Sequence, residues 1–166
     1  MIRVSKCLVL LGLVAFLGSV AIGQNLKNLA EQEGAAWLEG RWKTITDEGQ
    51  AISLNFCWAV EGNTIIVNTK IGDTTSQGMI YFSQDEQQVK QISVDSKGRV
   101  THSTWDAQYG KLILKTSMTD DDGQTKKLGV TFEEVDATTM TIKLYDMKYG
   151  QLSYEPWTEM EFKREK

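Results

Sequence analysis

Short strand-like segments follow one another from Gly40 to Arg164, with turn residues between them and no helical pattern in any interval. Each is a run of about 6 to 10 residues rich in Ile, Val, Thr and aromatic side chains, which is typical of a β-strand. Sequences such as Glu61-Gly62-Asn63 and Asp95-Ser96-Lys97-Gly98 favour tight turns between them. Because short turns join antiparallel strands whereas parallel strands need long crossovers, the chain is predicted to be an all-β antiparallel meander. About ten strands are expected, at Gly40–Thr46, Ala51–Val60, Thr64–Lys70, Gly78–Ser83, Val89–Val94, Arg99–Asp106, Lys111–Met118, Lys126–Glu134, Thr138–Tyr145 and Trp157–Arg164.

One face of these strands is apolar. In the second segment, for example, Ile52, Leu54 and Phe56 alternate with smaller or polar residues. A sheet of this kind can stay open, fold into a sandwich, or close on itself, and closure removes its exposed edges. Since nearly every connection is only a few residues long, we expect an up-and-down β-barrel of about 8–10 strands, wide enough to keep some interior volume. A short N-terminal helix is expected over Asn25–Glu33, where apolar residues recur at helical spacing.

The first residues have the pattern of an export signal. Two basic residues precede the apolar run Cys7–Val20, which ends in the small residues of Ala21-Ile22-Gly23. We therefore expect Met1–Gly23 to be a signal peptide and residues 24–166 to form the barrel domain. The alternative is a retained membrane anchor, but an apolar run of about 14–17 residues is shorter than the roughly 20 that a spanning helix needs. Since the residue directly after the cleavage site is Gln24 and not a Cys, the sequence predicts a secreted or periplasmic protein that is neither lipid-anchored nor membrane-spanning after cleavage.

The charge and the residue types narrow the range of functions. The chain has 18 Lys and Arg against 22 Asp and Glu, and removing two bases but no acid with the signal peptide changes the net charge from −4 to −6. Such a chain lacks the basic surface that nucleic acid binding requires, so no nucleic acid partner is expected. With one His and two Cys, the sequence offers no zinc site, and we expect no metal or other cofactor. The acidic run Asp120-Asp121-Asp122-Gly123 is expected to be a solvated turn rather than a cation site.

Two reactive side chains, Cys57 and His102, are candidate catalytic groups. After cleavage Cys57 is the only cysteine, so no internal disulfide can form, and no neighbouring base marks it as a nucleophile. His102 has the setting of an ordinary strand histidine. The sequence therefore predicts a non-enzymatic protein, while an enzyme that uses His102 or Cys57 with carboxylates brought near by folding remains an open alternative.

Gly40 and Trp42 open the first strand directly after the short helical entry. This Gly-x-Trp sequence resembles the signature of the lipocalins and the wider calycin barrels. The resemblance implies that Trp42 closes one end of the barrel, with a basic residue of the last strand, Lys163 or Arg164, stacked on its ring. The chain from residue 24 is also similar to the lipocalin-like domains of secreted bacterial proteins, through this opening and through the hairpin Trp58-Ala59-Val60-Glu61-Gly62-Asn63.

Aromatic and methionine side chains on the apolar face are the candidate ligand contacts. They are Phe56, Trp58, Tyr81, Trp105, Met118 and Met140. The leading hypothesis is a secreted barrel that binds a small apolar or amphipathic molecule in its interior. The alternative is a structural or protein-interaction module of the cell envelope with a solid barrel core, which bulky residues in every inward layer would favour.

Overall fold

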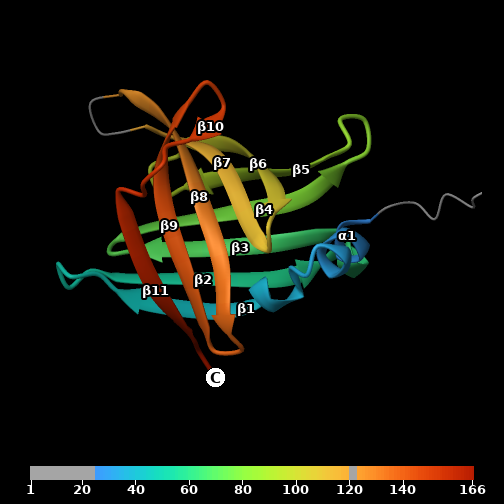
Figure 1. Ribbon diagram of the computed structural model, residues 1–166, viewed down its shortest axis with the longest axis horizontal. Coiled ribbons are helices and arrows are strands. Elements are labelled where there is room, and N and C mark those ends of the chain that lie inside the picture. The colour runs from blue at the N-terminus through green and yellow to red at the C-terminus, as the bar shows by residue number, and fades with distance from the viewer. Residues whose placement is uncertain (1–24, 120–122) are drawn as a thin grey trace, which may run out of the picture.

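Ten antiparallel strands close into an up-and-down barrel in the computed structural model, which describes residues 25–119 and 123–166 (Figure 1). The predicted all-β antiparallel barrel with a short N-terminal helix is confirmed. The ring consists of β1 (Gly40–Ile45), β2 (Ala51–Ala59), β3 (Thr64–Ile71), β4 (Thr74–Ser83), β5 (Gln88–Asp95), β6 (Val100–Gln108), β7 (Lys111–Thr119), β8 (Thr125–Asp136), β9 (Thr139–Lys148) and β11 (Thr158–Arg164). The remaining elements are the helix α1 (Leu26–Gln32), the 3₁₀ turns η1 (Ala36–Leu38) and η2 (Val60–Gly62), and the short strand β10 (Gln151–Leu152).

The barrel closes through β9 and β11. From β1 to β9 each strand pairs with the next one along the chain, and β11 then pairs with both β9 and β1. The last of these pairings places Trp42 opposite Arg164. The short strand β10 follows β9 in the sequence and pairs with the end of it, with Leu152 opposite Met147. The two form a small hairpin that precedes β11. Closure leaves the ring without a free strand edge.

The strand β4 is longer than its sequence pattern predicts. We expected it to begin at Gly78, but it begins at Thr74, which pairs with Ile71 of β3. The intervening residues are polar and show no apolar alternation, so a pattern based on burial misses them. Pairing with β3 on one side and β5 on the other holds this segment in the sheet regardless of its polarity.

The inward-facing residues of β4 to β7 change from apolar to polar along the barrel axis. On β6, Trp105 is buried among apolar neighbours, whereas Ser103 donates a hydrogen bond of 2.8 Å to Thr116 Oγ1 of β7. Elsewhere in the barrel the core is apolar, and Trp42 and Met140 have no exposed surface. On this side, therefore, the apolar part of the interior lies at the end that α1 covers.

The helix α1 covers one end of the barrel (Figure 1). The Asn25 side chain caps its N-terminus by accepting a hydrogen bond of 2.8 Å from the backbone N–H of Asn28. A helix of seven residues is too short to be stable alone in water. Its place is fixed instead by packing, since Leu26 is 4% exposed and belongs to the same apolar cluster as Leu38 and the barrel core.

Trp42 and Arg164 close the same end of the barrel on the side of β1 and β11. The guanidinium carbon of Arg164 lies 4.1 Å from the centroid of the Trp42 ring, so Arg164 rather than Lys163 is the stacked cation. The indole N–H of Trp42 donates to the carbonyl of Leu38 at 3.0 Å. Gly40 has a φ of +121°, and a Cβ at this position would lie 2.4 Å from Arg164 Nη1. The glycine therefore makes room for the arginine.

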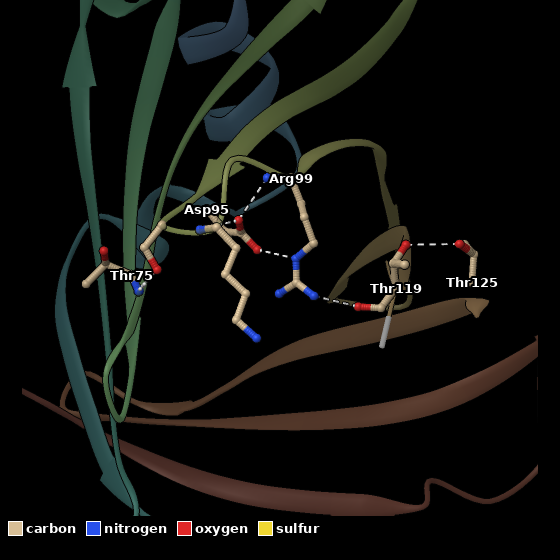
Figure 2. Close-up of polar contacts among 7 residues, drawn as sticks. Thr75, Asp95, Arg99, Thr119 and Thr125 are labelled. Atoms are coloured by element: carbon tan, nitrogen blue, oxygen red, sulfur yellow. Dashed lines mark hydrogen bonds and ion pairs between the residues drawn. The ribbon is translucent and has the colours of Figure 1, made fainter. Parts of the chain in front are cut away.

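Polar contacts tie together two hairpins at the opposite end (Figure 2). Arg99 donates from Nε to Asp95 Oδ2 at 2.7 Å and from Nη1 to the backbone carbonyl of Thr119 at 2.9 Å. Asp95 Oδ1 also accepts from the backbone N–H groups of Lys97 and Arg99, each at 2.9 Å. The hydrogen bonds from Arg99 and Lys97, together with the positive charge of Arg99, hold the pKa of the Asp95 carboxyl below its ordinary value. A polar network thus links the β5–β6 turn to the end of β7.

Two expectations from the sequence lie outside the described residues. These are the signal peptide Met1–Gly23 with its cleavage before Gln24, and the acidic residues Asp120–Asp122. Over the ranges that are described, none of the helices has the length and apolar character needed to cross a bilayer.

Candidate ligand-binding pocket

A pocket of about 460 Å³ lies between α1 and the apolar inner face of the barrel. This volume falls within the range of small-molecule sites in proteins. Its apolar lining comes from α1, the segment around η1, and the inner faces of β3 to β7, namely Leu26, Leu29, Ala30, Ala35, Leu38, Ile65, Ile80, Phe82, Val89, Trp105, Ala107 and Leu112. Its polar lining consists of Glu33, Glu86, Gln87, Gln88 and Asp106.

Trp105 forms an anchored part of the pocket wall. Its indole N–H donates to Gln91 Oε1 at 2.9 Å, and the Gln91 amide donates in turn to Ser93 Oγ at 2.7 Å. Gly78 on β4 leaves space for this chain of hydrogen bonds, since a Cβ there would lie 2.4 Å from Ser93 Oγ and 3.2 Å from Gln91 Nε2. A buried N–H without a partner is costly, so Gln91 fixes both the position and the polarity of the indole edge.

Two phenylalanine rings pack in a row behind Trp105. The Trp105 and Phe132 ring centroids are 5.1 Å apart, and Phe132 makes an edge-on contact with Phe56 at 6.4 Å between centroids. Neither Phe56 nor Phe132 lines the pocket. These three rings therefore mark the level at which the open volume ends and the solid core begins.

The pocket opens on the side where its lining residues are polar and exposed. Glu33 at the end of α1 and Glu86 and Gln87 in the β4–β5 turn are all exposed. Glu86 forms an ion pair of 2.5 Å with Lys90, and its hydrogen bond and negative charge raise the pKa of Lys90. The rim is therefore built from carboxylates and carboxamides around an apolar interior.

The sequence-predicted ligand contacts take different positions. Trp105 lines the pocket. Phe56 and Met140 are inward-facing but lie in the solid core, where they are 2% and 0% exposed. Trp58 is partly buried and packs against that core without lining the pocket. The structure thus brings one of these four side chains to the cavity.

The sequence pattern places Tyr81 and Met118 on the apolar inner face, and the structure differs at both positions. Tyr81 lies between Ile80 and Phe82, which both line the pocket, so strand alternation points Tyr81 to the outer face. Met118 is on the same face of β7 as Leu112 and Leu114, but it lies near the end of the strand, beyond the polar pair Ser103 and Thr116, and is 48% exposed. Neither side chain joins the apolar interior that was expected of it.

The residues of α1 are the part of the pocket that sequence reasoning missed. Leu26, Leu29 and Ala30 are the apolar residues at helical spacing in this segment, but nothing in the pattern indicates which surface they cover. The spacing of the three residues was a usable signal, since an apolar stripe on a short helix must be buried against another element.

The two candidate catalytic side chains lie on the outer face of the barrel. Cys57 is an exposed free thiol whose Sγ lies 3.6 Å from the carbonyl oxygen of Ile66, and His102 is an exposed residue opposite Ile92. Within the described ranges, His, Cys, Asp and Glu nowhere gather in a group of three that could hold a metal ion.

Comparison of the sequence with protein-family models and with curated proteins finds no match. The closed antiparallel barrel is consistent with a lipocalin-like or calycin-like architecture.

Proposed function

We propose that this protein is a secreted, non-enzymatic, lipocalin-like barrel that binds a small apolar or amphipathic molecule. The observation that carries the proposal is the 460 Å³ pocket between α1 and the apolar inner face of the barrel. Concave, mostly apolar sites with a few polar groups at one side are the usual form of small-molecule pockets. The stacking of Arg164 on Trp42, in the strand that Gly40 opens, supports the assignment to lipocalin-like barrels. The apolar run before residue 24 supports export.

A fluorescence titration with the uncharged probe N-phenyl-1-naphthylamine tests this proposal. We expect a saturable increase in probe fluorescence with one probe per chain. Ala107 lines the pocket, so Ala107→Phe fills part of the cavity and should weaken probe binding by on the order of tenfold or more. Thr104→Phe is the matched control, because Thr104 points outward from the same strand.

Loss of binding in Ala107→Phe with unchanged binding in Thr104→Phe supports the proposed site, provided that both variants keep the thermal transition of the wild type. Equal binding by both variants places the probe elsewhere on the protein. Absence of any saturable signal in the wild type contradicts ligand binding in the pocket.

A protein-interaction module is the second candidate, and a surface feature favours it. Val94 of β5 and Val100 of β6 are paired on the outer surface and are 47% and 56% exposed. Met79 of β4, which is 39% exposed, pairs with Ile92 two residues before Val94. An exposed apolar patch of this kind is typical of a contact with another protein. If this candidate holds, Val94→Lys abolishes self-association or partner binding in sedimentation experiments and leaves probe binding unchanged.

A further inference from the structure

We infer that the ligand of this pocket has a cationic, hydrogen-bond-donating headgroup attached to its apolar body, and that Glu33 receives this headgroup. This inference rests on the proposed function, since it specifies the chemistry of a ligand bound between α1 and the barrel.

The polar lining of the pocket has a one-sided composition. Three acidic residues and two glutamines line it, and among the residues that the structure describes no Lys or Arg lines the cavity. An anionic headgroup would therefore meet acidic residues and no basic residue in the lining. A headgroup that donates hydrogen bonds finds acceptors there.

Two of the three carboxylates already have partners on the outer surface. Asp106 pairs with Lys115 at 2.5 Å, and both side chains point outward, since their neighbours Trp105 and Leu114 point inward. Glu86 pairs with Lys90, which also faces outward next to the inward-facing Val89. These two acids are therefore compensated by lysines outside the pocket.

Glu33 differs from them in both placement and pairing. Its backbone N–H donates to the carbonyl of Leu29 at 2.9 Å, which fixes the residue at the C-terminal end of α1. Glu33 is one of the residues that line the pocket, and within residues 25–119 and 123–166 its carboxylate forms no ion pair or side-chain hydrogen bond.

The pocket and its rim therefore specify two parts of a ligand. The apolar wall of Ile65, Ile80 and Trp105 accommodates the body, and Glu33 lies at the exposed side where a headgroup emerges into water. Because the rim is exposed, the charge contact sets selectivity among amphiphiles rather than supplying most of the affinity.

Displacement of N-phenyl-1-naphthylamine by three amphiphiles of equal chain length tests the inference on the full protein. At pH 7 dodecylamine is cationic, dodecan-1-ol is neutral and dodecanoate is anionic. We expect displacement in the order amine, alcohol, carboxylate at low salt, at amphiphile concentrations below those that form micelles. The difference between amine and carboxylate should shrink at high salt, since ions screen exposed charges.

Two glutamate variants show whether Glu33 is responsible. Glu33→Gln should weaken dodecylamine binding about 2- to 5-fold and leave dodecan-1-ol unchanged, as expected for loss of one exposed charge contact. Glu31→Gln is the control, because Glu31 lies on the same helix but does not line the pocket. It should leave the order and the affinities of all three amphiphiles as in the wild type.

The outcomes separate this inference from the proposal beneath it. If the probe binds in the pocket and dodecanoate displaces it as well as dodecylamine does, or if Glu33→Gln has no effect, the inference is wrong and the proposed function stands. If the probe does not bind at all, the proposed function fails and takes the inference with it.

Discussion

The guanidinium group of Arg164 stacks on Trp42 and at the same time donates hydrogen bonds to three backbone carbonyls. The acceptors are the carbonyl oxygens of Trp37 at 2.6 Å, Glu39 at 2.5 Å and Ala137 at 3.0 Å. One side chain near the end of the barrel domain thus joins the segment before β1 to the β8–β9 turn. A lysine ammonium also has three donors, but it lacks the planar, forked shape that lets one side chain stack on an indole ring and reach three separate carbonyls.

Replacing this arginine tests its role in closing the barrel. Arg164→Lys should lower the free energy of unfolding by about 1–3 kcal/mol, since backbone carbonyls lose their donors. Urea unfolding followed by tryptophan fluorescence measures the change. Arg41→Lys, at an exposed position on β1, should change the stability by less than about 0.5 kcal/mol. Equal effects of the two variants would show that the contacts of Arg164 do not stabilise the barrel.

Gly40 should be intolerant of a side chain for a reason beyond its backbone angle. Gly40→Ala places a Cβ 2.4 Å from Arg164 Nη1, whereas Gly49→Ala, at a φ of +80°, meets no atom within 4 Å. Both variants carry the strain of a positive φ, about 1–3 kcal/mol. Gly40→Ala should therefore be the more destabilising by at least about 1 kcal/mol in thermal unfolding. A smaller loss than in Gly49→Ala would contradict the close approach of Arg164.

The hydrogen bond from Gln91 to Trp105 should matter more than a surface hydrogen bond between amides. Gln91→Leu leaves the buried indole N–H without its acceptor and should cost about 1–3 kcal/mol of stability. Gln77→Leu removes an exposed hydrogen bond of 3.0 Å to Asn68 and should cost less than about 1 kcal/mol. Chemical denaturation of both variants gives the comparison, and similar losses would argue that Trp105 is not held by Gln91.

The Asp95 carboxylate should make stability depend on pH in the acid range. Its pKa is lowered in the folded state, first by the hydrogen bond from the Arg99 backbone, so its contribution is present above the ordinary Asp pKa and is lost as pH falls through the lower folded value. Asp95→Asn should therefore be less stable than the wild type at pH 7 and lose less stability below about pH 4.

Urea midpoints measured from pH 7 down to pH 3 give this dependence. Asp85→Asn serves as the control because the Asp85 carboxylate has no side-chain hydrogen bond or ion pair within the described residues. Its midpoints should follow those of the wild type in parallel. If the urea midpoints of Asp95→Asn fell with pH as steeply as those of the wild type, Asp95 would not be a source of the pH dependence.

The local parts of this fold could be predicted from the sequence, because each depends on residues that are close together. Turn residues and alternation located the strands. The contact between Trp42 and a basic residue of the last strand, by contrast, joins distant segments and was expected only from the resemblance to lipocalins. The polar start of β4 was missed because strand pairing holds it without an apolar face: Thr74 pairs with Ile71 of β3, and from Ser76 onward β4 pairs with β5 as well.

The pocket was harder to predict because its walls come from distant parts of the chain. Alternation alone assigned Met118 to the interior, but its exposure depends on how far along the barrel axis the apolar layer extends. The placement of Leu29 and Glu33 against the barrel depends on how α1 docks, which no periodicity specifies. Among the six predicted ligand contacts, Trp105 is the one that lines the pocket.

Nuclear Overhauser contacts between N-phenyl-1-naphthylamine and labelled isoleucine methyl groups test the central claim most directly. Ile65 and Ile80 line the pocket, whereas Ile66 and Ile92 alternate with inward-facing residues and lie on the outer face. We expect contacts from the aromatic protons of the probe to the δ1 methyl groups of Ile65 and Ile80. Contacts confined to Ile66 and Ile92, or no contacts to any of the four under saturating probe, would contradict a ligand site inside this barrel.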